Sequence, residues 1–202
     1  MQYTTLRKMI LPLARATLAT SLMMLMTAGC ITSKISSPEQ TAVEQMLLST
    51  AASRALTSLD YSMFRDQKTF VDAQYLDSYR KEYVLGVLRD VLMVAGAHLV
   101  EDRENARLIV EPRSAALSLD ERSALLGIPS MPVPLTGGLV LPELALFKKT
   151  KQMALGSITV HGYDPDNEVP PFTLGPAIGR AYYSRWWFLF TISFRSTDVE
   201  EL

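Results

Sequence analysis

Apolar residues recur with the spacing of an amphipathic helix in two stretches of the chain. In residues 38–58 they form one stripe, and Ser37 followed by Gln40 has the pattern of a helix N-terminus with a capping box. In residues 78–95 they form a second stripe, which ends at Gly96, where a left-handed C-terminal cap belongs. The pattern therefore predicts two main helices.

Short apolar and β-branched runs lie on either side of the second predicted helix. Residues 67–72 and 98–100 have the composition of strands, and residues 107–111 form a further strand that Pro112 is expected to end. Strand, helix and strand in this order form the clearest structural unit of the sequence.

The middle of the chain combines a helix signal with a proline-rich stretch. Ser118 and Glu121 have the spacing of a second capping box and predict a short helix that ends at Gly127. The stretch 128–142 then holds four prolines, which disfavour both helix and internal strand. We expect an irregular connection there, and its length suggests a functional role.

Alternation of apolar and polar residues returns toward the C-terminus. Residues 157–162 predict a strand, 164–167 a turn and 170–178 an irregular segment. In residues 186–195 every second position is aromatic or isoleucine, which predicts a C-terminal aromatic strand. The expected fold class is α+β: a small mixed sheet packed on one face by two main helices, with a proline-rich irregular connection and a C-terminal aromatic strand.

The first 30 residues depart from the rest of the chain. With 202 residues, 48% hydrophobic and 20% charged, the composition fits one globular domain. The N-terminus instead has three basic residues up to Arg15, an uncharged apolar run over residues 16–26, and the small residues Ala28 and Gly29 before Cys30. These are the parts of a secretory signal peptide, and the run is shorter than the roughly 20 residues of a membrane-spanning helix.

Cys30 is the only cysteine, which excludes an internal disulfide and a zinc site built on several thiolates. The segment 26–30 resembles the bacterial lipobox, in which a small residue precedes the lipid-bearing cysteine. The resemblance implies cleavage before Cys30, a thioether-linked diacylglycerol and an acylated new N-terminus carrying fatty acids such as palmitate. Two or three such chains would hold the protein firmly on a membrane.

The lipobox resemblance also implies a cellular location and a domain organisation. Ile31, in place of aspartate, implies the outer membrane facing the periplasm under the sorting pattern of enteric bacteria. We therefore expect a lipoprotein signal peptide over residues 1–29, a tether over residues 30–37, and a single α+β periplasmic domain over residues 38–202.

Removal of the leader changes the charge balance of the chain. The mature chain would hold 17 basic and 21 acidic residues, a net charge of −4, because the three charged residues of the leader are all basic. No cluster of lysine and arginine remains that could hold a phosphate backbone, so we expect no nucleic-acid partner.

Residues typical of catalytic or metal sites are sparse. The two histidines, His98 and His161, lack a partner at metal-ligand spacing, and the sequence has no serine elbow and no phosphate-binding loop. We therefore expect a protein that is not an enzyme and that needs no metal or cofactor. Acids such as Asp72 and Asp102 leave a periplasmic carboxylate-dependent hydrolase as an alternative.

Two segments are candidate partner surfaces. Aromatic residues cluster at the last strand, where Tyr183 and Trp187 are candidates to face a protein partner or a bilayer surface. Leu141, at the end of the proline-rich stretch, is a candidate in a second docking surface. Both segments can also be explained without a partner, the first as a core strand and the second as a loop that wraps its own domain.

Several segments resemble a family of uncharacterised bacterial lipoproteins. They are Lys68–Asp72, Tyr83–Val84 with Leu88, Gly96–Val100, Glu104–Val110 and Leu126–Pro129, with Gln152, Gly156 and the Trp186–Trp187 pair. The architecture is distantly similar to that of lipopolysaccharide-assembly and curli-secretion envelope lipoproteins. Architecture alone does not establish function, and we expect an accessory lipoprotein that binds an envelope protein in transport, secretion or surface assembly. A lipid- or glycan-binding module that uses the aromatic strand is a further alternative.

Overall fold

The computed structural model describes residues 40–78, 80–132, 140–166, 169–189 and 192–200. All of them belong to one unit that spans Glu39–Leu202. The predicted signal peptide, the tether and Cys30 lie outside the described residues.

Helix α2 (Ala42–Thr57) begins with a capping box, although not the predicted one. The Thr41 hydroxyl accepts a hydrogen bond from Glu44 N, and the Glu44 carboxylate accepts one from Thr41 N. The predicted cap residue Ser37 lies outside the described residues, and Gln40 instead accepts at its carbonyl from the side chain of Gln45. The helix predicted over residues 38–58 is confirmed with a later start.

The predicted strand–helix–strand unit is confirmed. Strand β1 (Lys68–Val71) pairs in parallel with β2 (His98–Leu99), and α3 (Lys81–Val94) connects the two strands. Gly96 has a φ of 95°, in the left-handed region that glycine favours after a helix.

Strand β3 (Leu108–Ile128) runs through the positions where a strand end and a short helix were predicted. Both predictions are wrong, because β3 pairs along almost its whole length with β6 (Leu144–Tyr163). Pairing outweighs the local helix signal at Ser118, which lies opposite Leu155. Pro112 is tolerated because its missing N–H would face away from β6, in the direction in which the carbonyl of Val110 accepts from Asp72 N.

The C-terminal region also differs from its prediction. Strand β7 (Phe172–Phe188) occupies most of the segment expected to be irregular, and the predicted aromatic strand is a hairpin of β7 with β8 (Ile192–Thr197). Leu189 has a φ of 46° where the chain turns after β7. Phe188 pairs with Ile192 and Trp186 pairs with Phe194, so these residues share one face, as predicted, from two strands.

The proline-rich stretch is less irregular than expected. Strand β4 (Met131–Pro132) pairs antiparallel with β5 (Val140–Leu141) in a small sheet of its own. Residues 133–139 lie outside the described residues. This β4–β5 hairpin connects β3 to β6.

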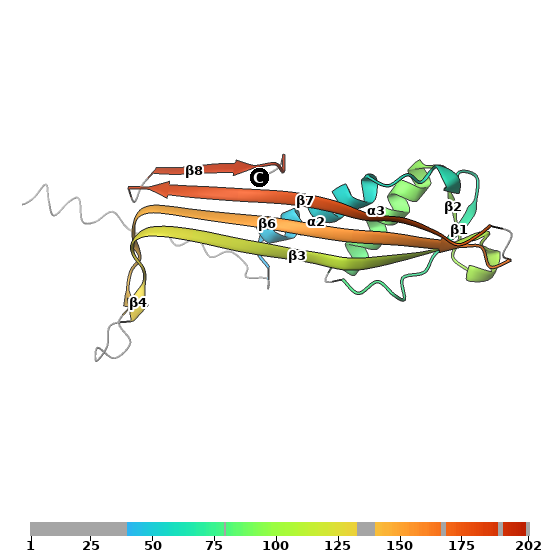
Figure 1. Ribbon diagram of the computed structural model, residues 1–202, viewed down its shortest axis with the longest axis horizontal. Coiled ribbons are helices and arrows are strands. Elements are labelled where there is room, and N and C mark those ends of the chain that lie inside the picture. The colour runs from blue at the N-terminus through green and yellow to red at the C-terminus, as the bar shows by residue number, and fades with distance from the viewer. Residues whose placement is uncertain (1–39, 79, 133–139, 167–168, 190–191, 201–202) are drawn as a thin grey trace, which may run out of the picture. The chain divides into compact units, whose positions relative to one another are not determined.

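The six strands of the main sheet follow the order β2-β1-β3-β6-β7-β8, and both helices lie on one face (Figure 1). Glycines let α2 approach the sheet closely: a Cβ atom at Gly179 would lie 1.9 Å from the carbonyl oxygen of Ala51. The core beneath the helices includes fully buried Leu56, Leu88 and Ile158. The expected α+β class, with a mixed sheet packed by two helices, is confirmed.

Candidate interaction surfaces

The long strands β3, β6, β7 and β8 extend beyond the part of the sheet that α2 and α3 cover (Figure 1). One row of paired residues lies near the start of α2 and marks this boundary: Glu121, Gln152, Tyr183 and Thr197. We call the described residues from this row to the β4–β5 hairpin, both included, the open end. It comprises residues 121–132, 140–152, 183–189 and 192–197.

Large apolar side chains concentrate at the open end. Of the eighteen large hydrophobic side chains that are exposed among the described residues, twelve belong to it. These twelve are Leu126, Ile128, Met131, Val140, Leu141, Leu144, Leu146, Trp187, Phe188, Leu189, Ile192 and Phe194. A soluble domain rarely exposes a large contiguous apolar surface without a binding role.

On the face turned away from the helices, the open end changes character in steps of two residues. The outermost row is entirely apolar and consists of Leu126, Phe147, Phe188 and Ile192. The next row consists of Ala124, Lys149, Trp186 and Phe194. The third row consists of Arg122, Lys151, Ser184 and Ser196. Along the strands, the rows therefore change from apolar residues to aromatic and basic residues, and then to polar and basic residues.

Basic side chains of the open end lie against aromatic rings. The Lys149 ammonium lies 5.4 Å from the centre of the Trp186 ring, and the Lys151 ammonium lies 5.8 Å from that of Tyr182. Lys148 forms an ion pair with Glu143, with 2.8 Å between Nζ and Oε1. The open end holds six basic and two acidic residues, although the whole chain has a net charge of −1.

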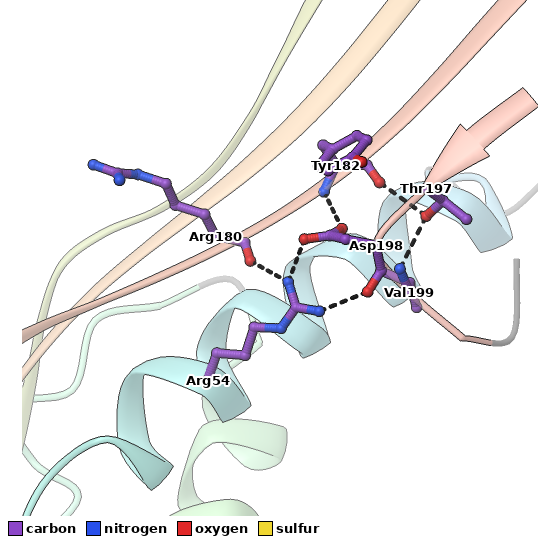
Figure 2. Close-up of polar contacts among 6 residues, drawn as sticks. All are labelled: Arg54, Arg180, Tyr182, Thr197, Asp198 and Val199. Atoms are coloured by element: carbon purple, nitrogen blue, oxygen red, sulfur yellow. Dashed lines mark hydrogen bonds and ion pairs between the residues drawn. The ribbon is translucent and has the colours of Figure 1, made fainter.

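Where β8 stops, side chains occupy the edge of β7 (Figure 2). The Arg54 guanidinium on α2 donates to the carbonyl oxygen of Arg180 at 2.6 Å and forms an ion pair with Asp198 at 2.5 Å. Asp198 accepts from Tyr182 N at 2.7 Å, and the Thr197 hydroxyl donates to the Tyr182 carbonyl oxygen. These contacts satisfy edge groups that would otherwise be free to pair with another strand.

The outer edge of β3 has no such cover among the described residues. Strand β1 pairs with β3 only at Leu108–Val110, and no other described strand pairs with this side of β3. From Glu121 to Ile128, β3 is paired with β6 alone. This stretch therefore presents unpaired backbone groups, which can bind an added strand.

The alternation of hydrogen bonds identifies which β3 amides point outward. The backbone N–H of Tyr182 points toward β8, so the backbone groups of its neighbour Tyr183 point toward β6, where Tyr183 pairs with Gln152. The backbone N–H and C=O groups of Lys151, the residue before Gln152, therefore point toward β3. Those of its partner Arg122 point toward β6. The amides of the residues beside Arg122, which are Glu121 and Ser123, consequently point away from the sheet.

The three predicted partner residues have different environments. Trp187 in β7 is 38% exposed and Leu141 in β5 is 44% exposed, and both lie in the open end. Tyr183 is only 7% exposed, because it packs with Leu47 and Leu48 of α2, and its hydroxyl accepts hydrogen bonds from Arg185. The outermost apolar row, the Arg54–Asp198 contact and the open edge of β3 were not recognised in the sequence.

Several carboxylates, including those named as candidate acids, have polar partners. The Asp72 carboxylate forms an ion pair with Arg103 at 3.1 Å, and Arg103 also bonds to the Tyr163 hydroxyl. Burial, as the largest cause, raises the pKa of Tyr163. Asp102 accepts from the side chain of Asn105, and buried Asp164 accepts from the backbone amides of Asp166 and Val169. No group of three potential metal ligands occurs among the described residues.

Two surface hollows lie beside the helices and not at the open end. One is lined by residues such as Arg54, Arg80 and Tyr83, and the other by residues such as Leu59 and Tyr61. Neither hollow includes a residue of the Trp186–Phe194 segment. Within the described ranges, no helix has the length and apolarity needed to cross a membrane.

A model of a family of unknown function, DUF6655, matches residues 24–199. No curated protein matches the chain.

Proposed function

We propose that the chain, which belongs to the DUF6655 family of unknown function, is a lipid-anchored accessory protein of the bacterial envelope that binds a protein partner. The lipid on Cys30 holds it on a membrane. The proposed location is the outer membrane, on the side that faces the periplasm. The partner belongs to transport, secretion or surface assembly. The protein acts by binding and not by catalysis.

The open outer edge of β3 is the observation that carries this proposal. Its stretch from Glu121 to Ile128 is paired on one side only, and an extended segment of a partner could add to it as a further strand. The opposite edge strand is the shorter β8, and beyond its end Arg54 and Asp198 occupy backbone groups of β7. Strand β3 therefore offers the longer unpaired edge to an added strand.

Side chains beside the open edge favour selectivity. The side chains of Glu121 and Ser123 project from the helix-covered face, and the side chain of Arg122 projects from the other face. An added strand would therefore meet a different charge on each side. Backbone hydrogen bonds would supply affinity, and the side chains would select the partner and its register.

The test uses Ser123, whose amide points outward. Ser123→Pro removes one edge donor without removing a hydrogen bond to β6, whereas the matched control Ser123→Ala keeps the donor. A photoreactive amino acid at Glu121 reports the partner in living cells. The same residue at Arg89, which is exposed on α3, is the position control.

We expect a covalent adduct of defined mass from position 121 and none from position 89. The adduct should persist with Ser123→Ala and disappear with Ser123→Pro, because only proline removes the N–H that a partner strand requires. Equal adducts from the alanine and proline variants would contradict binding at this edge. The lack of any adduct along β3 would contradict the function itself.

A further inference from the structure

The open end has a second property that binding at the β3 edge does not use. Its exposed apolar side chains lie on both faces of the sheet: Phe188 and Phe194 project from one face, and Trp187 projects from the other. Leu189 and the β4–β5 hairpin are exposed as well. A folded protein partner would cover one side of such an end, whereas a fluid apolar medium would surround it.

The order of residues along the strands matches the depth profile of a bilayer surface. On the outer face, the fully apolar row of Phe188 precedes the row of Trp186 and Lys149, and the row of Lys151 and Arg122 follows. Successive rows are about 7 Å apart, because each spans two residues of an extended strand. Hydrocarbon, then the interfacial belt of tryptophan, then anionic headgroups follow one another at a membrane over a similar distance.

The face toward the helices has the last two steps of this order. There Leu125, Lys148 and Trp187 form a row, and the next row inward holds Arg185 and Arg195. Both arginines are exposed. On both faces, basic residues thus lie beside the tryptophans and one row behind them, where phosphate groups of lipid would meet them.

We propose that the open end docks into the surface of an anionic lipid bilayer, with the Phe188 row below the headgroups and the tryptophans among them. The excess of basic residues at this end, in a chain that is otherwise acidic, selects anionic lipid. The docked end lies within the interface and does not span the membrane. It gives the protein a contact with lipid in addition to the proposed anchor at Cys30.

The protein contains its own reporter of this contact. Trp186 and Trp187 are its only tryptophans, and both belong to the open end. Tryptophan fluorescence of the full chain on vesicles therefore reports the environment of this end and not that of the N-terminus. Vesicles of neutral lipid, of mixed neutral and phosphatidylglycerol lipid, and of the same mixtures with brominated acyl chains are the probes.

We expect emission to shift to shorter wavelength and to be quenched by brominated lipid in the anionic vesicles, and much less in the neutral ones. Neutralising Lys149 and Lys151 together, as glutamines, should lower the docking equilibrium constant about 25-fold, since each basic residue near an anionic surface contributes about 1 kcal/mol. Lys68→Gln with Lys81→Gln removes the same charge from the covered part of the molecule and should leave the quenching unchanged.

Three outcomes would overturn the proposal. They are an unquenched emission on anionic vesicles, equal quenching on neutral vesicles, and equal losses from both lysine pairs. A blue shift without quenching by brominated lipid would assign the end to contact with a second copy of the chain instead. The adduct at position 121 is independent of these readings, so failure of lipid docking leaves the proposed partner binding to be judged by its own test.

Discussion

The close contact between α2 and the sheet gives a prediction whose sign depends on position. A Cβ atom at Gly179 would lie 1.9 Å from the oxygen of Ala51 and 2.6 Å from the nitrogen of Ala55. Both are backbone atoms of a packed helix and cannot move aside as a flexible side chain would. Gly179→Ala must therefore push α2 away from β7, and we expect a loss of about 3 kcal/mol in the free energy of unfolding, the upper part of the range for overpacking.

Two other glycines supply graded controls for the same chemical change. A Cβ at Gly156 would lie 3.2 Å from the carbonyl carbon and oxygen of Ala51, which a small shift relieves, so we expect a loss of about 1 kcal/mol. At Gly86, in the interior of α3, a Cβ would meet nothing within 4 Å. Gly86→Ala should stabilise by up to about 1 kcal/mol, because alanine is the better helix former.

Urea unfolding followed by circular dichroism measures all three variants on one scale. The predicted order of stability is Gly86→Ala, the parent protein, Gly156→Ala and Gly179→Ala, with an unchanged dependence on urea concentration. If Gly179→Ala were as stable as the parent, α2 would not lie on β7 as described. If all three variants lost stability equally, the close approach would not be the cause.

Three further predictions concern the edge contact, a buried tyrosine and the anchor. Arg54→Ala should lower the free energy of unfolding by about 1–2 kcal/mol, since it removes charged hydrogen bonds to Asp198 and the Arg180 carbonyl, whereas Arg180→Ala keeps that carbonyl and should cost little in the same urea assay. Burial raises the pKa of Tyr61, whose hydroxyl has no hydrogen-bond partner among the described residues, so stability should fall as the pH rises above 10, where the unfolded chain ionises first. Tyr61→Phe should raise stability at pH 7 by about 1 kcal/mol and lessen that alkaline loss, and a lower stability at pH 7 would show that the hydroxyl has a partner. Cys30→Ser should abolish labelling with radioactive palmitate and leave the precursor uncleaved, and unchanged labelling would refute the lipid anchor.

The sequence predicted the elements whose signals are local. The stripe of α2, the Gly96 cap after α3 and the strands on either side of that helix depend on residues close together in the chain. The structure has all of them, because nothing in the tertiary packing opposes those signals. The face shared by Trp186 and Phe194 was also predicted, since the turn between β7 and β8 preserves the alternation.

The sequence misled where long-range pairing opposes a local signal. Ser118 and Glu121 have capping-box spacing, yet each pairs with a residue of β6 that is more than thirty positions away in the sequence. Gly127 reads as a helix end but lies at an irregularity of the β3–β6 ladder, with a φ of 151°. The turn after Phe188 contains no glycine, proline or asparagine, so β7 and β8 read as one strand.

The candidate surfaces depend on the same pairing. Trp187 and Leu141 stood out by residue type, but Tyr183 also stood out and is buried under α2. The apolar row of Leu126, Phe147 and Phe188 joins three segments of the chain, and only strand register brings them together. The free edge of β3 is a property of strand order, which no local pattern encodes.

Amide hydrogen exchange along β3 tests the central claim most directly, residue by residue in the isolated protein. If β3 is one strand paired with β6 alone, the amides of Asp120 and Arg122 should exchange slowly, while those of Glu121 and Ser123 exchange fast. Fast exchange at all four amides would contradict the pairing with β6. Slow exchange at all four would show an edge that is already covered and is not available to a partner.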